Sequence, residues 1–145
     1  MNAPKNKDPK RVGFLRDEKG NVNPNSYFSD MKGLIDYIHS KGLKAGIYTS
    51  PGTLTCGGFT GAFQHEAQDA RQFADWGFDF LKYDWCSYGD IATNGIKDDT
   101  TIPHWGKGSP TLEAYQYPYR KMGKILQQQN RDIVYNLCQY GMGDV

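Results

Sequence analysis

The sequence predicts an α/β fold in which helices alternate with short parallel strands. Two observations support this prediction. Apolar residues at helical spacing are followed directly, three times along the chain, by a short apolar run, and turn residues bound these runs. Each run is apolar enough to be covered on both faces, which is typical of a parallel sheet or barrel, although a doubly wound sheet gives the same pattern. The 145 residues are enough for one domain or part of one.

The first 25 residues are polar and rich in Lys, Asn, Asp and Pro, so we expect a loop or extended lead-in that contributes little to the core. A first helix is predicted over residues 31–42. Ser29 or Asp30 is its N-cap, and Gly42 is its stop.

The next segments repeat this order. Residues 43–50 are predicted to form a short buried strand, followed by a glycine-rich loop over 51–63. A second helix over 65–77 ends at Gly77, and it leads directly into a second strand over 78–84.

The last unit has a longer connection. Residues 85–110 are predicted to form a polar loop, which at this length usually carries function. A third helix over 111–129, whose start is blurred by Pro118, leads to a third strand over 132–138.

The stretch "DFLKYDWCSYGD" places charged residues at the end of the second strand. Phe80, Lys82 and Asp84 share one face by strand alternation, and we expect this face to point to the core. Ligand sites of such folds lie at the carboxyl ends of the strands. Asp84 is therefore either a structural ion-pair partner of Lys82 or a catalytic carboxylate that Lys82 keeps ionised.

Composition excludes several classes of partner. Seventeen basic and sixteen acidic residues leave a net charge of +1, so we expect no nucleic-acid partner. The apolar runs are far shorter than the roughly 20 residues of a membrane helix, and no hydrophobic stretch follows the N-terminal lysines, so we expect no membrane span and no signal peptide in this chain. Aromatic residues make up 14% of the chain and suit sugar faces as well as cores.

The three cysteines, Cys56, Cys86 and Cys138, lack metal-site spacing, and the odd number suggests one pair and one free thiol. Cys56 and Cys86 both follow strands at the same end of the sheet. They could therefore meet in one disulfide, with two reduced thiols as the alternative.

No cofactor and no metal are expected, because His39 and His65 have no second ligand at a suitable spacing. Motifs for acyl transfer, nucleotide binding and hydride transfer are absent from the sequence. An unrelated barrel enzyme that forms a Schiff base on Lys82 remains an alternative.

The blocks "GLKAGIYTSPGTLTCGGFTGAF", "FADWGFDFLKYDWC" and "IVYNLCQYGMGDV" resemble, in order and spacing, the melibiase-type α-galactosidases of glycoside hydrolase family 27. The resemblance implies a (β/α)8 barrel, of which residues 1–145 would hold about three consecutive units. It also implies a retaining glycosidase whose nucleophile is Asp84. The resemblance further implies a disulfide between Cys56 and Cys86. It also implies a sugar pocket lined by the two cysteines and by Tyr48, Lys82, Trp85 and Gln139.

The resemblance also implies a larger parent enzyme, which acts on a small molecule or oligosaccharide with a terminal α-galactose. Its first two strands would precede Met1, and its acid/base aspartate would follow Val145. The disulfide implies a secreted or periplasmic parent. Gln139 stands where many members carry Glu, which leaves α-N-acetylgalactosaminides and β-L-arabinopyranosides as alternative substrates. The alternative to an enzyme is an inactive fragment that only binds carbohydrate.

Overall fold

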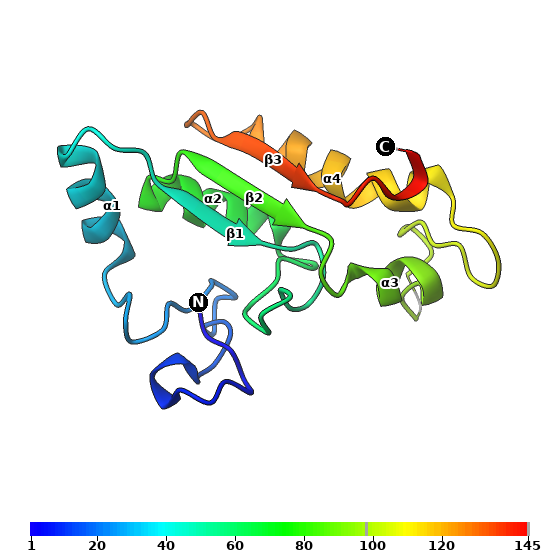
Figure 1. Cartoon of the computed structure of the whole chain (residues 1–145), viewed down its shortest axis with the longest axis horizontal. Coiled ribbons are helices and arrows are strands. Elements are labelled where there is room, and N and C mark those ends of the chain that lie inside the picture. The colour runs from blue at the N-terminus through cyan, green and yellow to red at the C-terminus, as the bar shows by residue number, and fades with distance from the viewer. Residues whose placement is uncertain (98, 145) are drawn as a thin grey trace.

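The computed structural model describes residues 1–97 and 99–144 and contains a parallel sheet of three strands in the order β1-β2-β3 (Figure 1). The strands are β1 (Gly46–Thr49), β2 (Phe80–Asp84) and β3 (Val134–Cys138). The predicted alternation of helices and parallel strands is confirmed. Each strand begins two or three residues later than the sequence suggested.

Three helices alternate with the strands: α1 (Met31–Ser40), α2 (Glu66–Trp76) and α4 (Leu112–Leu126). α2 and α4 lie behind the sheet in Figure 1, and α2 packs against both α1 and α4. Their contact with the sheet forms the core, whose most deeply buried large apolar side chains are Ile35, Phe73, Leu81, Tyr83 and Met122.

The helix ends follow from local chemistry. The carboxylate of Asp30, one of the two predicted caps, accepts a hydrogen bond of 2.8 Å from the Gly33 N–H and thereby caps α1. α2 ends as predicted at Gly77, whose φ of 95° requires the left-handed conformation that glycine adopts without strain.

Two details of the third unit differ from the prediction. The segment 85–110 is interrupted by a helix, α3 (Tyr88–Asn94), because Tyr88, Ile91 and Ala92 form an apolar face at helical spacing that becomes buried. Pro118 lies inside α4 and does not blur its start, since Thr111 caps the helix and the buried face of α4 outweighs the loss of one backbone hydrogen bond.

The first 25 residues contain a short 3₁₀ turn, Pro9–Arg11, and one isolated bridge between Arg16 and Val22. They contribute more to the core than we expected. Val22 is buried, and the Arg16 guanidinium donates to both carboxylate oxygens of buried Asp69, at 2.6 and 2.9 Å. The lead-in is thereby attached to α2.

The two faces of the sheet differ. Leu81 and Tyr83 face the helices and are buried, whereas Phe80 lies on the opposite, open face, level with Val134 of β3. Phe80 is 36% exposed and Val134 is 64% exposed. Lys82 and Asp84 share one face, as strand alternation predicted, but this face is not the one packed against the helices, which corrects the expectation that it points to the core. Within the residues that the structure describes, no helix has the length and apolar character needed to cross a bilayer.

Candidate active site

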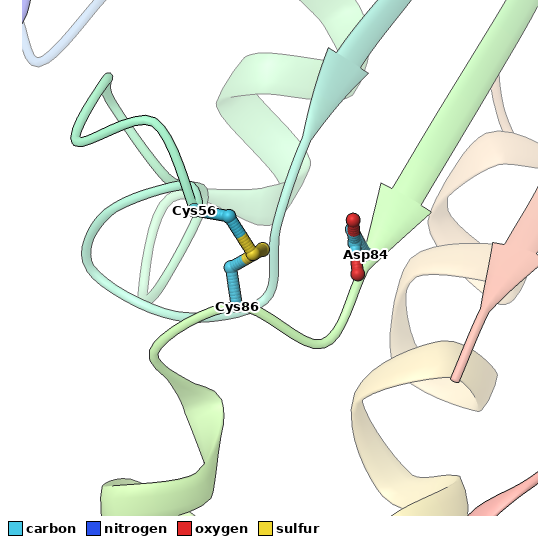
Figure 2. Close-up of side chains that lie close together, drawn as sticks. All are labelled: Cys56, Asp84 and Cys86. Atoms are coloured by element: carbon cyan, nitrogen blue, oxygen red, sulfur yellow. A yellow bond between two sulfur atoms is a disulfide. The ribbon is translucent and has the colours of Figure 1, made fainter. Parts of the chain in front are cut away.

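The loops that follow β1 and β2 meet at the carboxyl end of the sheet and are joined by a disulfide between Cys56 and Cys86 (Figure 2). The two Cα atoms are 4.9 Å apart across 30 residues of sequence. The predicted pairing is confirmed, and Cys138 is a free thiol. The two loops pack tightly at Gly52, where a Cβ atom would clash with Ser87 Oγ and with the Cys86 carbonyl oxygen.

Asp84 lies at the end of the central strand, beside the disulfide, and is 6% exposed (Figure 2). Each oxygen of its carboxylate accepts one hydrogen bond from a phenol. Tyr48 on β1 donates to Oδ2 at 3.1 Å, and Tyr140, which follows β3, donates to Oδ1. Such donors replace the hydrogen bonds to water that a buried carboxylate loses.

The Tyr48 hydroxyl also lies 3.1 Å from the Sγ of Cys86. A disulfide sulfur carries no proton, so Tyr48 is the donor in either contact. Its single proton goes preferentially to the ionised carboxylate, which is the stronger acceptor. Tyr48 therefore links the nucleophile candidate to the disulfide.

Both phenols remain protonated donors at neutral pH. Burial, followed by the negative charge of Asp84, raises the pKa of Tyr48. The hydrogen bond to Asp84, followed by burial, raises the pKa of Tyr140 well above its ordinary value.

Lys82 lies on the same face but does not pair with Asp84. Among the residues that the structure describes, no ion pair within 4.0 Å joins the two side chains. The Lys82 ammonium instead lies 5.8 Å from the centroid of the Tyr48 ring, a cation–π geometry.

Trp85 and Gln139 are placed differently from the other predicted site residues. Trp85 is buried, and its ring packs against three tyrosines of α3 and α4: Tyr88, Tyr115 and Tyr119. These are the contacts of a core residue. The amide of Gln139 donates to the Met142 carbonyl oxygen in the loop after β3, so it orders this loop rather than contacting Asp84.

Cys56, Asp84 and Cys86 bring one ligand atom each within 4.8 Å of one another. This cluster does not fit a metal ion, because both sulfurs are used in the disulfide and neither is available as a thiolate ligand. One carboxylate is left, which suits a nucleophile or a base better than a metal site.

Tyr140 is the site residue that the sequence analysis missed. The register pairs Asp84 with Cys138, so residues just after β3 lie level with the end of β2. The sequence offered one signal for Tyr140: it is a polar aromatic residue two positions after the third predicted strand, at the strand end where ligand sites of such folds lie.

Comparison with known proteins gives a consistent result. The family described as Alpha galactosidase A matches residues 8–103. Alpha-galactosidase 2 of Arabidopsis thaliana is 39% identical over 132 residues, which cover 89% of this chain and 28% of the plant protein. The chain thus spans about 28% of the length of this curated relative.

Solved structures match over nearly the whole chain. α-Galactosidase I from Mortierella vinacea has a TM-score of 0.68 at 35% identity, covering 87% of this chain and 28% of the fungal one. The α-galactosidase of Saccharomyces cerevisiae, solved with raffinose, has a TM-score of 0.69 at 28% identity and covers 88% and 25%. These matches confirm that the three units are part of a (β/α)8 barrel.

Proposed function

Because this chain belongs to the family described as Alpha galactosidase A, we propose that it is part of a retaining glycoside hydrolase that removes terminal α-D-galactosyl residues. The observation that supports this most strongly is the position of Asp84. It is a nearly buried carboxylate at the carboxyl end of the central strand, hydrogen-bonded on both oxygens and next to the site disulfide.

In this proposal Asp84 attacks the anomeric carbon and forms a covalent glycosyl-enzyme, which water then hydrolyses. Each carboxylate oxygen keeps a second lone-pair direction after accepting from Tyr48 or Tyr140, so attack does not require both hydrogen bonds to break. Tyr48 and Lys82 would bind sugar hydroxyls from the same face. The acid/base carboxyl group, needed about 5 Å from Asp84, would come from the parent protein beyond Val145.

The proposed substrate is a small molecule or oligosaccharide with a terminal α-galactose, and the yeast relative solved with raffinose supports this class. Two further structures, from Bacillus halodurans and Geobacillus stearothermophilus, are also similar, but at 20% and 19% identity they support the fold alone. The disulfide supports a parent protein that is exported to an oxidising compartment.

Covalent trapping tests the mechanism. The full-length parent would be incubated with a 2-deoxy-2,2-difluoro galactoside that carries an activated leaving group, then digested and analysed by mass spectrometry. We expect the sugar on the peptide that contains Asp84. A label on another carboxylate, in an enzyme that hydrolyses an aryl α-galactoside, would contradict the assignment.

The matching variant is Asp84→Asn, which keeps the side-chain volume and removes the nucleophile. We expect turnover of an aryl α-galactoside to fall by several powers of ten. Asp36→Asn is the control, since Asp36 lies on α1 and its exposed carboxylate pairs with the exposed Lys32 ammonium. A parent that binds galactose and hydrolyses none of the three candidate glycosides would instead support a carbohydrate-binding protein.

A further inference from the structure

The contact between Tyr140 and Asp84 joins the ends of two neighbouring strands. Tyr140 donates to Oδ1, and Tyr48 donates to Oδ2 from the other neighbouring strand. The carboxylate is therefore held from both sides, by phenols that approach from β1 and from the end of β3. Rotation of the carboxylate about its Cβ–Cγ bond would break both hydrogen bonds at once.

The backbone of Tyr140 gives independent evidence. Its φ is 64°, in the left-handed region that residues with a Cβ rarely adopt. Burial does not explain this conformation, because Tyr140 is 64% exposed. In this backbone conformation the Tyr140 hydroxyl donates to Oδ1 of Asp84.

We propose that Tyr140 is a positioning residue that fixes the plane of the Asp84 carboxylate for attack on the sugar. This inference rests on the proposed function of Asp84 as the nucleophile. A small misplacement of a nucleophile slows the chemical step strongly, while substrate binding by other groups is unaffected. Tyr140 should therefore influence kcat rather than KM.

The first test compares Tyr140→Phe with Tyr37→Phe in the full-length parent. Tyr37 is an exposed residue of α1, and its ring contacts only the Lys41 ammonium among the aromatic and cation–π contacts of the described residues. We expect Tyr140→Phe to lower kcat on an aryl α-galactoside by about 10- to 100-fold, the usual effect of losing a hydrogen bond to a charged group, with KM changed less than about threefold. Tyr37→Phe should match the parent. An unchanged kcat in Tyr140→Phe would overturn the inference.

A second measurement detects the contact without activity and without removing the phenol. 3-Fluorotyrosine is placed at position 140 alone, and its ionisation is followed by ¹⁹F NMR. Asp84, Cys138 and Tyr48 are the titratable groups that raise the pKa of Tyr140, and Asp84 has the largest effect. The Asp84→Asn substitution should therefore lower the pKa of the fluorophenol. Identical titrations with and without this substitution would overturn the contact.

The two proposals fail in different ways. Full activity of Asp84→Asn would overturn the nucleophile assignment and the positioning role that rests on it. An inactive Asp84→Asn together with a fully active Tyr140→Phe would overturn the positioning role alone. The ¹⁹F titration retains the phenol, so a lower melting temperature of Tyr140→Phe would leave this test of the contact unaffected.

Discussion

Lys82 is the residue whose role changes most between sequence and structure. Strand alternation correctly places it on the same face as Asp84, which suggested an ion pair. The structure instead places its ammonium near the Tyr48 ring, and the donors to Asp84 are phenols. In the proposed function, the Lys82 ammonium would bind a sugar hydroxyl without first breaking an ion pair with a carboxylate.

Lys82→Met in the parent protein tests this role. Because the lysine does not pair with Asp84, we expect KM for an aryl α-galactoside to rise about 10- to 100-fold and kcat to fall less than about tenfold. Steady-state kinetics on the variant and the parent measure both values. A large loss of kcat at constant KM would favour the other interpretation, in which Lys82 keeps the carboxylate ionised.

Sequence reasoning predicted a site around Asp84, Lys82, Cys56 and Cys86 because local alternation and strand ends bring these residues together. It could not predict the contact between Tyr140 and Asp84. That contact depends on the pairing register of two strands that are far apart in sequence, and Tyr140 has a positive φ; neither feature has a local pattern.

Asp79, just before β2, connects the helices and strands at the opposite end of the sheet. Its carboxylate accepts from His39 of α1 at 2.7 Å, from the Ala45 N–H at 2.9 Å, from Lys44 at 3.2 Å and from Arg131 at 2.7 Å. Burial acts to raise the pKa of Asp79, but these hydrogen bonds outweigh it and hold the pKa well below its usual range.

Because the pKa of Asp79 is lowered in the folded protein, we expect this carboxylate to make a pH-dependent contribution to the free energy of unfolding. A carboxyl group whose pKa is lowered on folding stabilises the fold above its unfolded pKa of about 3.9, and the stabilisation is lost as the pH falls through the folded value. We expect Asp79→Asn to lower the free energy of unfolding of the parent by about 2 kcal/mol at neutral pH. The difference should shrink as the pH falls below about 4.

Denaturant unfolding of Asp79→Asn at several pH values measures this difference. Asp36→Asn, which removes one exposed ion pair, should change stability by less than about 0.5 kcal/mol. An Asp79→Asn effect that stays constant from neutral pH down to about pH 3 would mean that the carboxylate charge does not stabilise the fold.

The disulfide joins two site loops and closes a segment of 30 residues. In the chain-entropy model, closing a loop of this size stabilises by about 3 to 4 kcal/mol, so Cys56→Ser/Cys86→Ser should lower the free energy of unfolding of the parent by about that amount.

For residues 1–145, thiol counting under denaturing, non-reducing conditions should find one free thiol, that of Cys138. Three free thiols would contradict the pairing.

The elements that the sequence predicted well are those with an apolar face directly followed by a stop signal, such as α2 with Gly77. α3 was missed because it is only seven residues long and lies among polar residues. Its burial depends on contact with Trp85, which in turn packs against α4. Tertiary packing, rather than intrinsic propensity, forms this helix.

At the scale of the whole molecule, helices of the described residues 1–97 and 99–144 cover one face of the sheet and leave the other open. Helices cover Leu81 and Tyr83, while the open face and the β3 edge present apolar side chains, including Val134 and Leu137, which are 64% and 55% exposed. Both outer strands also have an unpaired backbone edge within the described part of the chain. Such edges and patches pair readily with other chains unless they are covered.

Residues 1–145 produced alone should therefore associate, and we also expect them not to hydrolyse α-galactosides. Lost acid catalysis typically costs about 10²- to 10⁴-fold, and the resemblance places the acid/base group outside this segment. Size-exclusion chromatography with light scattering, run beside an aryl α-galactoside assay, measures both properties. Val134→Lys should reduce the association by placing a charge on the open face, whereas Leu43→Lys adds the same charge to an exposed loop position before β1 and should not. A stable monomer that turns over substrate at the rate of an intact enzyme would show that these three units form a complete catalyst.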